Sequence, residues 1–435
     1  MVRRGAWLGR RAIAPLGLLV LMFVLPFVTG PGCLPGEAPE ESLDFRNTMD
    51  PTNDGATYVG SAACSACHPD LAETFRSHGH GQALHRVQGA APEYAGVGVR
   101  AGVPNPPTGR TWNDVSYVIG GYAHNALFVD RDGYVLTDGV AGVPTQWLLD
   151  FPPNGARAGF VPYLPSRAAP LPYEYDCFRC HTTGPVRQDA AQPRSQDGRP
   201  GIQGTWAEPG VHCEACHGPG SHHVPNPHLR NIFVDATVQT CARCHTAGDN
   251  PDVIVAADGY INPYAQYAEL RASGGHRNFQ CTICHDPHSS TVYDRARGLR
   301  NGCTVCHVDA NLAFHDDFVF QRGDYREPVT CESCHMSFTG RSGSAAGPDV
   351  LGDSAGRIAD VRSHIFRIAG NNGDYRQMFS TDGTQVVKDA QGRAAVSLDF
   401  VCLRCHNGVG NAFLLTPSGA TVIAEGIHRN AARGN

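Results

Sequence analysis

The sequence predicts a loop-rich fold in which short helices and small β-hairpin insertions wrap around stacked flat cofactors. Two observations lead to this expectation. The pentapeptide Cys-x-x-Cys-His occurs eight times in 435 residues and uses 16 of the 17 cysteines. Glycine and proline contribute 50 and 31 residues, about 19% of the chain against a usual share of about 12%. So much loop leaves little apolar surface for a protein-only core, and we expect bound cofactors to supply the missing apolar volume.

The repeated pentapeptide predicts covalently attached haem. Two thiols separated by two residues can form thioethers with the two vinyl groups of one haem, and the following His then reaches the iron. A zinc ribbon or a disulfide also uses paired cysteines, but neither requires a His in the next position every time. We therefore expect eight haem c groups. Their attachment sites and proximal ligands are Cys64, Cys67 and His68; Cys177, Cys180 and His181; Cys213, Cys216 and His217; Cys241, Cys244 and His245; Cys281, Cys284 and His285; Cys303, Cys306 and His307; Cys331, Cys334 and His335; and Cys402, Cys405 and His406.

The amino-terminal residues predict export and a membrane attachment. Four arginines precede an apolar run from Ala12 to Val28, and small residues follow it, so residues 1–32 are expected to be a signal peptide. The run is 17 residues long and contains two prolines, which is short for a membrane span of about 20 residues. The remaining cysteine, Cys33, lies directly after this segment and resembles the lipidated cysteine of a bacterial lipoprotein. Residues 33–56 are rich in Pro and Glu and are expected to be a flexible tether.

Residues 57–338 are expected to form a region with seven haems, and residues 339–435 a carboxyl-terminal region with the eighth. Pro69 after the first motif indicates a helix start. Residues 115–119 and 126–129 are β-prone, and the turn at residues 130–133 predicts a hairpin before Tyr134. Residues 389–392 carry a second hairpin signal. Between residues 177 and 335 the motifs follow one another at 22 to 40 residues, too closely for separate domains, so we expect neighbouring haems to share walls.

The histidines outside the motifs predict a second axial ligand for each iron. There are 13 of them, whereas after the predicted signal only Met49, Met336 and Met378 could give methionine ligation. Bis-histidine coordination is therefore expected, and it implies lower reduction potentials than His/Met coordination. His212 is excluded because it adjoins Cys213 and is constrained by that attachment. From their spacing and local context, the candidate distal ligands are His124, His223, His276, His288, His315, His364 and His428.

Two segments resemble multihaem cytochromes c of the c-552/4 type. Residues 58–68, followed by Phe75, His80 and Ala83, resemble the opening of that family, although the family usually has Trp where Phe75 stands. Residues 210–223 resemble a recurring segment of the same family. The resemblance implies that His80 rather than His78, and His223 rather than His222, are distal ligands. Residues 281–288 resemble doubled Cys-x-x-Cys-His cytochromes. Together the resemblance covers residues 57–335 and implies closely stacked haem pairs and electron transfer.

Charge and location narrow the expected partners. The formal charge is −6, and residues 1–32 hold four arginines and no acid, so the remainder carries −10. Such a surface has no electrostatic reason to bind nucleic acid. We expect redox proteins as partners, namely cytochromes, a quinol-oxidising complex or an outer-membrane conduit. The expected location is the periplasm or the outer membrane, including the cell surface, with membrane contact only through a lipid on Cys33.

Two functions remain open from the sequence. One is an electron conduit in a respiratory chain, without catalysis of its own, and the sequence favours it. The other is an octahaem oxidoreductase acting on small nitrogen or sulfur oxyanions, which needs one iron with an open distal side. Octahaem and pentahaem nitrite reductases commonly have Lys in place of one proximal His, and no Cys-x-x-Cys-Lys occurs here. Tetrathionate-type enzymes take a lysine ligand from elsewhere in the chain, a role that only Lys388 could fill.

Overall fold

The computed structural model describes residues 50–96, 101–191, 193–229, 231–235, 237–342, 356–425 and 427–430. The predicted signal peptide, Cys33 and most of the predicted tether lie outside these ranges. Across the described ranges, no helix combines the length and the apolar character needed to traverse a bilayer.

The helices are short, as the sequence predicts, and several of them contain all or part of a Cys-x-x-Cys-His motif. The predicted helix after the first motif is confirmed as α2, and α2 and α12 are the longest helices in the described ranges, with eight residues each. The α-helices are α1 (Ser61–Ser65), α2 (Pro69–Arg76), α3 (Asp138–Ala141), α4 (Tyr175–Phe178), α5 (Cys213–His217), α6 (Val238–Ala242), α7 (Gln266–Arg271), α8 (Cys281–Cys284), α9 (Arg295–Gly298), α10 (Cys331–His335), α11 (Leu398–Val401), α12 (Pro417–Ala424) and α13 (Ile427–Asn430). The 3₁₀ turns are η2 (Trp112–Asp114), η3 (Gln196–Gly198), η4 (Pro227–Leu229), η5 (Gly274–His276), η6 (Cys303–Val305), η7 (Ala313–His315) and η8 (Tyr375–Met378).

A nine-stranded sheet lies between the first and third motifs, and it is larger than the small hairpin insertions that the sequence predicts. The predicted hairpin is present as strands β2 to β4, but it forms the middle of the sheet, whose main order is β1-β2-β3-β4-β7-β10-β9. Strand β5 pairs with β3 and β6, and only the β7–β10 pair is parallel. The strands are β1 (Leu84–Arg86), β2 (Val115–Gly120), β3 (Asn125–Asp130), β4 (Tyr134–Val135), β5 (Gln146–Leu148), β6 (Gly159–Val161), β7 (Leu171–Glu174), β9 (Val186–Arg187) and β10 (Ile202–Thr205).

The sequence predicts too small a sheet, because the strands other than β2 and β3 have only two to four residues each. Such strands are too short to show an alternating pattern, and their signal is lost among the prolines and glycines of this region. Strand β2 is buried on both faces. Tyr117 and Ile119 pack into one apolar cluster, and Val115 and Val118 pack into another. A strand covered on both sides appears in the sequence as a continuous apolar run, which is why residues 115–119 were detectable.

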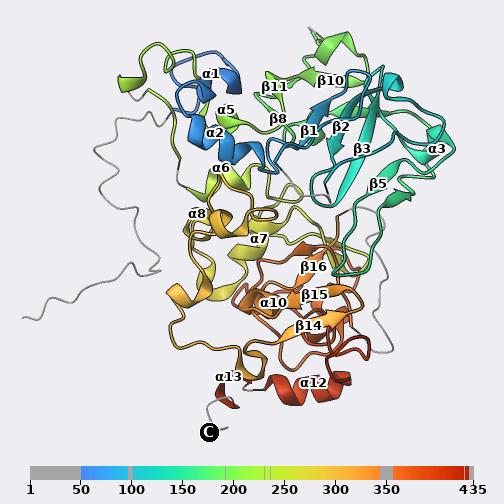
Figure 1. Cartoon of the computed structure of the whole chain (residues 1–435), viewed down its shortest axis with the longest axis vertical. Coiled ribbons are helices and arrows are strands. Elements are labelled where there is room, and N and C mark those ends of the chain that lie inside the picture. Colours follow the sequence, from blue (N-terminus) through green and yellow to red (C-terminus); the bar gives the residue numbers. More distant parts are fainter. Residues whose placement is uncertain are drawn as a thin grey trace, which may run out of the picture.

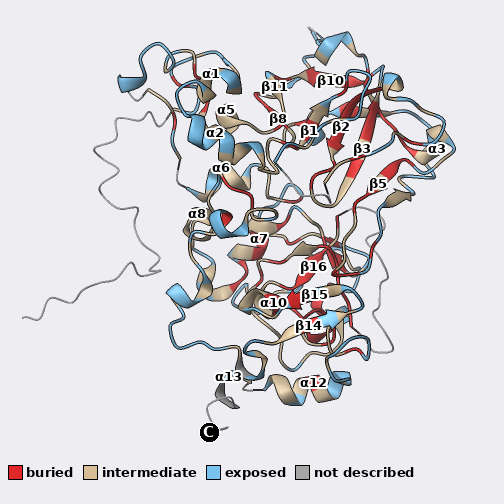
Figure 2. Ribbon diagram, in the orientation of Figure 1, coloured by how far each residue is buried: buried red, intermediate tan, exposed pale blue. Residues whose placement is uncertain are grey.

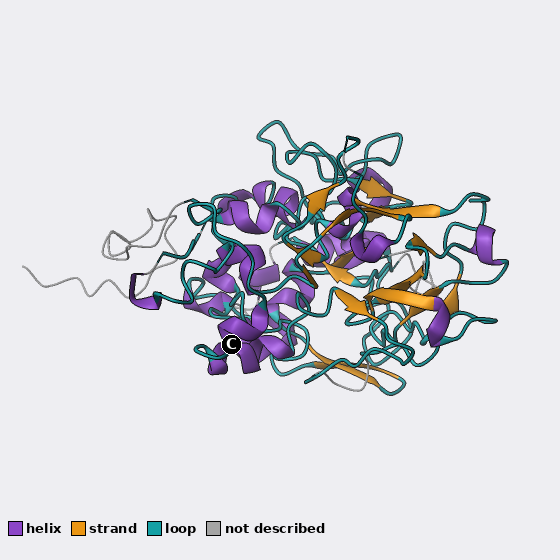
Figure 3. Cartoon of the chain, turned by 90° about the horizontal axis from the view of Figure 1, so that it is seen from above, coloured by secondary structure: helices purple, strands orange, loops and turns teal. Residues whose placement is uncertain are grey.

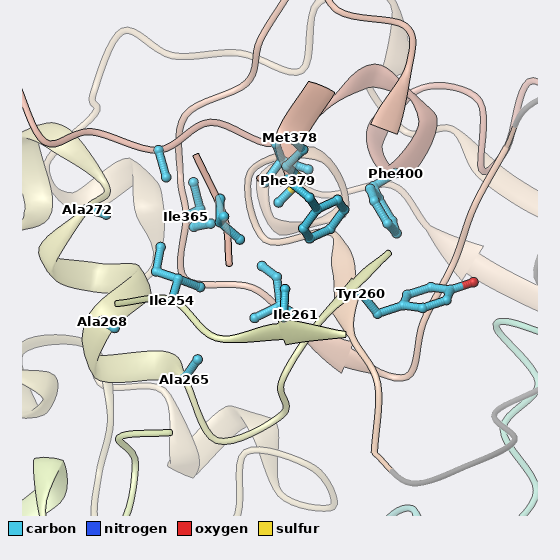
Figure 4. Close-up of a cluster of buried hydrophobic side chains, with 14 of the residues drawn as sticks. Ile254, Tyr260, Ile261, Ala265, Ala268, Ala272, Ile365, Met378, Phe379 and Phe400 are labelled. Atoms are coloured by element: carbon cyan, nitrogen blue, oxygen red, sulfur yellow. The ribbon is translucent and has the colours of Figure 1, made fainter. Parts of the chain in front are cut away.

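A second core holds the carboxyl-terminal half together (Figure 4). It joins buried residues between 247 and 272 to buried residues between 359 and 401, including Ile254, Ile261, Ile365 and Phe400. A four-stranded sheet of order β12-β13-β16-β17 passes through it. Its strands are β12 (Ala256–Ala257), β13 (Tyr260–Ile261), β16 (Phe338–Gly340) and β17 (Val361–Arg362). Two-stranded sheets complete the fold, from β8 (Thr182–Thr183) with β11 (Glu208–Pro209) and from β14 (Val319–Arg322) with β15 (Tyr325–Pro328).

The second predicted hairpin is present only as its turn. Gly392 N–H donates to the carbonyl of Asp389, and Asp389 N–H donates to that of Arg393, each at 2.8 Å. Among the described residues no named strand flanks this turn. The residues on either side bond to other segments instead. Val386 N–H donates to the carbonyl of Ile254 at 2.9 Å, and Ala394 N–H donates to that of Ala272 at 2.8 Å.

The elements are arranged as a helical side and a strand side. Seen from above, most helices gather on one side of the molecule and most strands on the other (Figure 3). Along the longest axis, α1 and α2 lie at one end and α12 and α13 at the opposite end (Figure 1). Burial is concentrated in the sheet strands and around β16, while much of the helical side is half-buried or exposed (Figure 2). The helical side is therefore the part of the molecule with the less dense protein core.

A buried carboxylate in the second core gives a prediction about stability. Asp399 is 1% exposed, and burial raises its pKa to about 6. The folded state therefore binds its proton more tightly than the unfolded state, and stability is lost as the pH rises from about 4 to 6. We expect Asp399→Asn to be more stable than the natural chain at pH 7.5 by about 1–2 kcal/mol, after allowing for solvent screening. Denaturant unfolding at pH 7.5 and pH 4 tests this, because at pH 4 the two chains should be equally stable.

Candidate haem-binding sites

Each motif folds as about one helical turn. The His N–H donates to the carbonyl of the first Cys in the first, fourth, fifth, sixth and eighth motifs, at 2.9–3.0 Å. Residues four apart lie on the same side of a helix, so this turn presents the first thiol and the imidazole on one face. The geometry explains the spacing of the motif, because one five-residue turn can offer both the attachment point and the proximal ligand to one macrocycle.

Six motif histidines face a second histidine that was selected from the sequence as a distal ligand. With about 2.0–2.1 Å per metal–nitrogen bond and about 1.1 Å from nitrogen to ring centre, two imidazoles on one metal ion lie roughly 6.3 Å apart. The observed ring centres are 5.8–6.2 Å apart. This spacing fits an iron ion between the rings. The pairs are His245 with His80, His217 with His288, His285 with His364, His307 with His276, His335 with His428, and His406 with His315.

Hydrogen bonds at Nδ1 orient several of these rings. An imidazole that donates from Nδ1 keeps the Nε2 lone pair available for a metal. Among the motif histidines, His181, His217, His335 and His406 lie 2.8–3.0 Å from a main-chain oxygen through Nδ1, and His245 lies 3.3 Å from Gln266 Oε1. These contacts are those of the neutral tautomer that a metal ligand requires.

Burial keeps the rings neutral. It lowers the pKa of His181, His245 and His285, and that of His364 falls to about 3. Burial is again the largest cause of the lowered pKa of His80, and the nearby His78 and His245 lower it further. Metal binding requires the unprotonated imidazole, so these environments favour ligation at neutral pH.

The structure also places the histidines that the sequence analysis ranked lower. His78 stacks on Phe75, with ring centres 5.2 Å apart and planes 3° apart, whereas His80 points to the fourth motif. His212 Nε2 lies 3.0 Å from the carbonyl of Pro209, which occupies the nitrogen that a ligand would use. His222 Nδ1 lies 3.1 Å from the carbonyl of Asn53.

Two motif histidines are not brought opposite a second histidine in the described ranges. His68 is exposed; it and His223 both lie within electrostatic range of His217, but no ring contact joins the two. His181 is half-buried and makes no ring contact with another described histidine. In the remaining candidate, His124, Nδ1 lies 3.8 Å from Asp360 Oδ2, and the ring centre lies 6.1 Å from that of Phe151.

Two tyrosines near the second motif were not predicted. Burial raises the pKa of Tyr264, with Cys180, Asp360 and Cys177 as further causes. Burial likewise raises the pKa of Tyr163, and the nearby Cys177 and Tyr264 raise it further. Both phenols therefore lie around the attachment cysteines of this motif. They are about a hundred residues apart in the chain, and no local pattern links either one to residues 177–181.

The attachment cysteines of neighbouring motifs lie close together and give the order of the motifs in space. Hydrogen-bonded thiols join the first motif to the third, the fourth to the fifth and the sixth to the seventh. Electrostatic interactions between cysteines link the third motif to the fourth and the seventh to the eighth. Asn301, just before the sixth motif, donates from Nδ2 to the carbonyl of Ile283 in the fifth at 2.6 Å. The second motif branches from the fourth through Cys180 and Cys244. The motifs thus form one row with one branch.

The two variable residues inside a motif often tie it to its neighbour. Glu214 in the third motif accepts hydrogen bonds from the main-chain N–H groups of Val59, Gly60 and Gly220 at 2.7–3.0 Å, which fixes the chain before the first motif. Arg179 in the second motif donates to the carbonyl of Arg243 in the fourth at 2.8 Å.

A buried ion pair links the seventh and eighth motifs. Arg404 in the eighth motif is 2% exposed and forms a two-point ion pair with Glu327 at 2.8 and 2.9 Å. Glu327 also accepts a hydrogen bond from Ser333 in the seventh motif at 3.0 Å. Burial opposes ionisation of Glu327, but the bonds from Arg404 outweigh it and lower its pKa to about 2. A charge buried this deeply requires its partner, so the pair fixes how the two motifs sit together.

Lys388 lies away from the motifs. Its ammonium donates to the carbonyl of Asp252, and its other charge neighbour is Arg271. It lines an open cavity of about 300 Å³ with Ile254 and Ser380. This position gives no support to a lysine ligand.

Comparisons with known proteins agree with the motif geometry. Residues 167–218 match the family described as cytochrome c554 and c-prime. The dissimilatory sulfite reductase MccA of Wolinella succinogenes is 22% identical over 410 residues, which cover 72% of this chain and 55% of that protein. The chain therefore spans just over half the length of this curated relative.

Two solved structures are also similar. The octahaem sulfite reductase MccA of Wolinella succinogenes (form II) has a TM-score of 0.50 and 18% identity, covering 80% of this chain and 65% of that one. The outer cell wall cytochrome OcwA has a TM-score of 0.47 and 16% identity, covering 84% of this chain and 86% of that one. At these identities the first likeness concerns the fold alone.

The motifs predict the haem content of the mature protein. We expect intact-mass measurement to give the mass of the chain plus eight haem groups, which remain after acid–acetone extraction because thioethers do not dissociate. Changing both cysteines of one motif to alanine should lower the count by one. A mass without haem, or a zinc content near eight per chain, would contradict the assignment.

Proposed function

We propose that the chain, which its motifs and relatives identify as a multihaem c-type cytochrome, carries eight haem c groups and conducts electrons outside the cytoplasm. The observation that supports this role is the continuous row of neighbouring motifs, which runs from the first motif to the eighth. Haem supplies one-electron redox chemistry, and the chain attaches each group, orients its ligands and excludes water.

We assign the six facing pairs of histidines as axial ligands. For the first motif we assign His223 to His68, because both lie near His217. Bis-histidine ligation favours low reduction potentials. The Glu327–Arg404 pair places a compensated charge between the last two motifs, so neither haem there faces an isolated buried charge.

The proposed setting follows from the sequence. The predicted export segment and the acidic balance of the remaining chain fit an extracytoplasmic redox protein. Its partners would be other redox proteins, namely cytochromes, a quinol-oxidising complex or an outer-membrane conduit. We keep the lipid on Cys33 as a proposal for its membrane attachment.

Deleting single haems tests the conduit. The Cys281→Ala/Cys284→Ala variant removes the fifth haem, which lies within the row. When photoreduced flavin donates electrons after a laser flash, we expect the natural chain to be reduced in a single fast phase. In this variant we expect an additional reduction phase that is at least tenfold slower, because electrons can no longer equilibrate along the row. The matched control, Cys177→Ala/Cys180→Ala, removes the branch and should keep the single fast phase. Equal behaviour of the two variants would refute the row.

A second candidate function rests on the second motif. His181 is half-buried and faces no described histidine, unlike six other motif histidines, and Tyr163 and Tyr264 lie near its cysteines. An iron with an open side, beside groups able to donate protons, is the arrangement that reduction of small oxyanions requires. We therefore keep reduction of a small nitrogen or sulfur oxyanion at this site as the alternative, with the fold likeness to a sulfite reductase in support.

Spin state separates the two candidates. If the second haem has an open side, electron paramagnetic resonance of the oxidised protein should show a high-spin signal that changes when cyanide or sulfite is added. That signal should disappear in Cys177→Ala/Cys180→Ala and persist in Cys281→Ala/Cys284→Ala. A ligand-responsive signal that persists when the second haem is deleted would place the open iron elsewhere, and a spectrum with eight low-spin irons would leave only the conduit.

A further inference from the structure

A short segment of the second core meets the histidines of three motifs. Within residues 363–366, His364 faces His285 of the fifth motif at 6.0 Å between ring centres. Two residues later, the carbonyl of Phe366 accepts a hydrogen bond from Nδ1 of His335 in the seventh motif at 2.8 Å. The ring of Phe366 lies 4.5 Å from that of His276, with 36° between the planes. His276 is the histidine that faces the sixth motif.

His276 differs from the histidines that a hydrogen bond orients. Among the described residues, no protein atom accepts a hydrogen bond from its ring. Its ring contacts besides His307 are with two phenylalanines. Phe279 meets it edge-on at 5.2 Å and 83°, and Phe366 lies more nearly over its face. Packing against these rings therefore determines how the imidazole is turned.

The turn that carries His276 is short. His276 ends the three-residue turn η5, whose first residue, Gly274, has φ +77° and whose N-cap Ser273 makes no capping bond from its side chain. A turn of this length has few internal hydrogen bonds to keep a side chain in place. The ring could rotate unless a neighbour restrains it.

The segment that carries Phe366 is firmly held. Glu269 is 3% exposed and accepts hydrogen bonds from Ser363 Oγ at 2.9 Å and from the N–H of His364 at 2.5 Å. Ile365 is fully buried in the second core (Figure 4). Phe366 thus projects from a fixed main chain toward a histidine that has no other strong restraint.

We propose that Phe366 is a positioning residue for the sixth haem: its ring sets the imidazole plane of His276, while its main chain orients His335 and the adjacent His364 serves the fifth haem. One rigid segment would then fix ligands of three neighbouring haems. This inference rests on the proposed function, because it takes His276, His335 and His364 as axial ligands. Groups that orient a ligand also tune its metal, so the effect is measurable at the iron.

The test uses paramagnetic resonance and potentiometry on the full-length oxidised protein. The signal of a low-spin ferric haem depends on the angle between its two imidazole planes, which is 49° for His276 and His307. His276→Ala should convert one low-spin component to high spin and so identify the sixth haem. We expect Phe366→Leu to shift the position and the midpoint potential of that same component most. A smaller shift is expected for the fifth haem, because the Phe366 ring also meets that of His364 edge-on at 6.4 Å. The seventh haem should stay unchanged, because the carbonyl that His335 uses remains.

Two matched variants separate positioning from packing. Phe366→Tyr keeps the ring and should restore the natural spectrum. Ile365→Val removes one buried methylene from the same segment without touching a ligand, and should leave all components in place. The inference is overturned if Phe366→Leu leaves the component identified by His276→Ala unmoved, or shifts every component alike. If His276→Ala removes no low-spin component, the ligand assignment itself fails, and that result is distinct from a failure of Phe366.

Discussion

Each haem needs a ligand that its own motif cannot supply. One helical turn offers two thiols and one imidazole on one face, so the opposite face of the macrocycle must be met by a residue from elsewhere. In the arrangement that we propose, His80 near the beginning of the described chain serves the fourth motif, and His428 near its end serves the seventh. These ligands close long loops that glycine- and proline-rich segments would otherwise leave open. The helical side can then remain ordered with little protein core.

The residues inside the motifs carry a second set of constraints. Glu214, Arg179 and Arg404 occupy variable positions of the pentapeptide, yet each bonds to the chain around another motif. Their partners are main-chain groups or a buried carboxylate, which fix distance and orientation more tightly than apolar contact alone. The spacing between neighbouring haems is therefore determined largely by side chains that the motif definition leaves unspecified.

The sequence could predict what is local. The motifs, the helix after Pro69 and the hairpin at residues 115–135 depend on neighbouring residues, and the structure has the helix and the hairpin where expected. Five histidines chosen for their spacing and context, and His80 chosen from the family resemblance, also lie opposite a motif histidine. Relations between distant residues were not accessible, because no local pattern records them. The order of the motifs, in which the third follows the first, is one example. The ring of Tyr264 near Cys177 and the role of Glu327 are others.

The second motif is supported by a protein core. Its residue Phe178 is fully buried and packs with Tyr173 and Trp206 in a core that belongs to the nine-stranded sheet. The eighth motif is supported in a similar way, because its residue Leu403 is fully buried with Leu398 and Ala420. A chain loaded incompletely would keep its protein packing at these two motifs. Maturation would then start from two preformed scaffolds, one at the nine-stranded sheet and one in the carboxyl-terminal half.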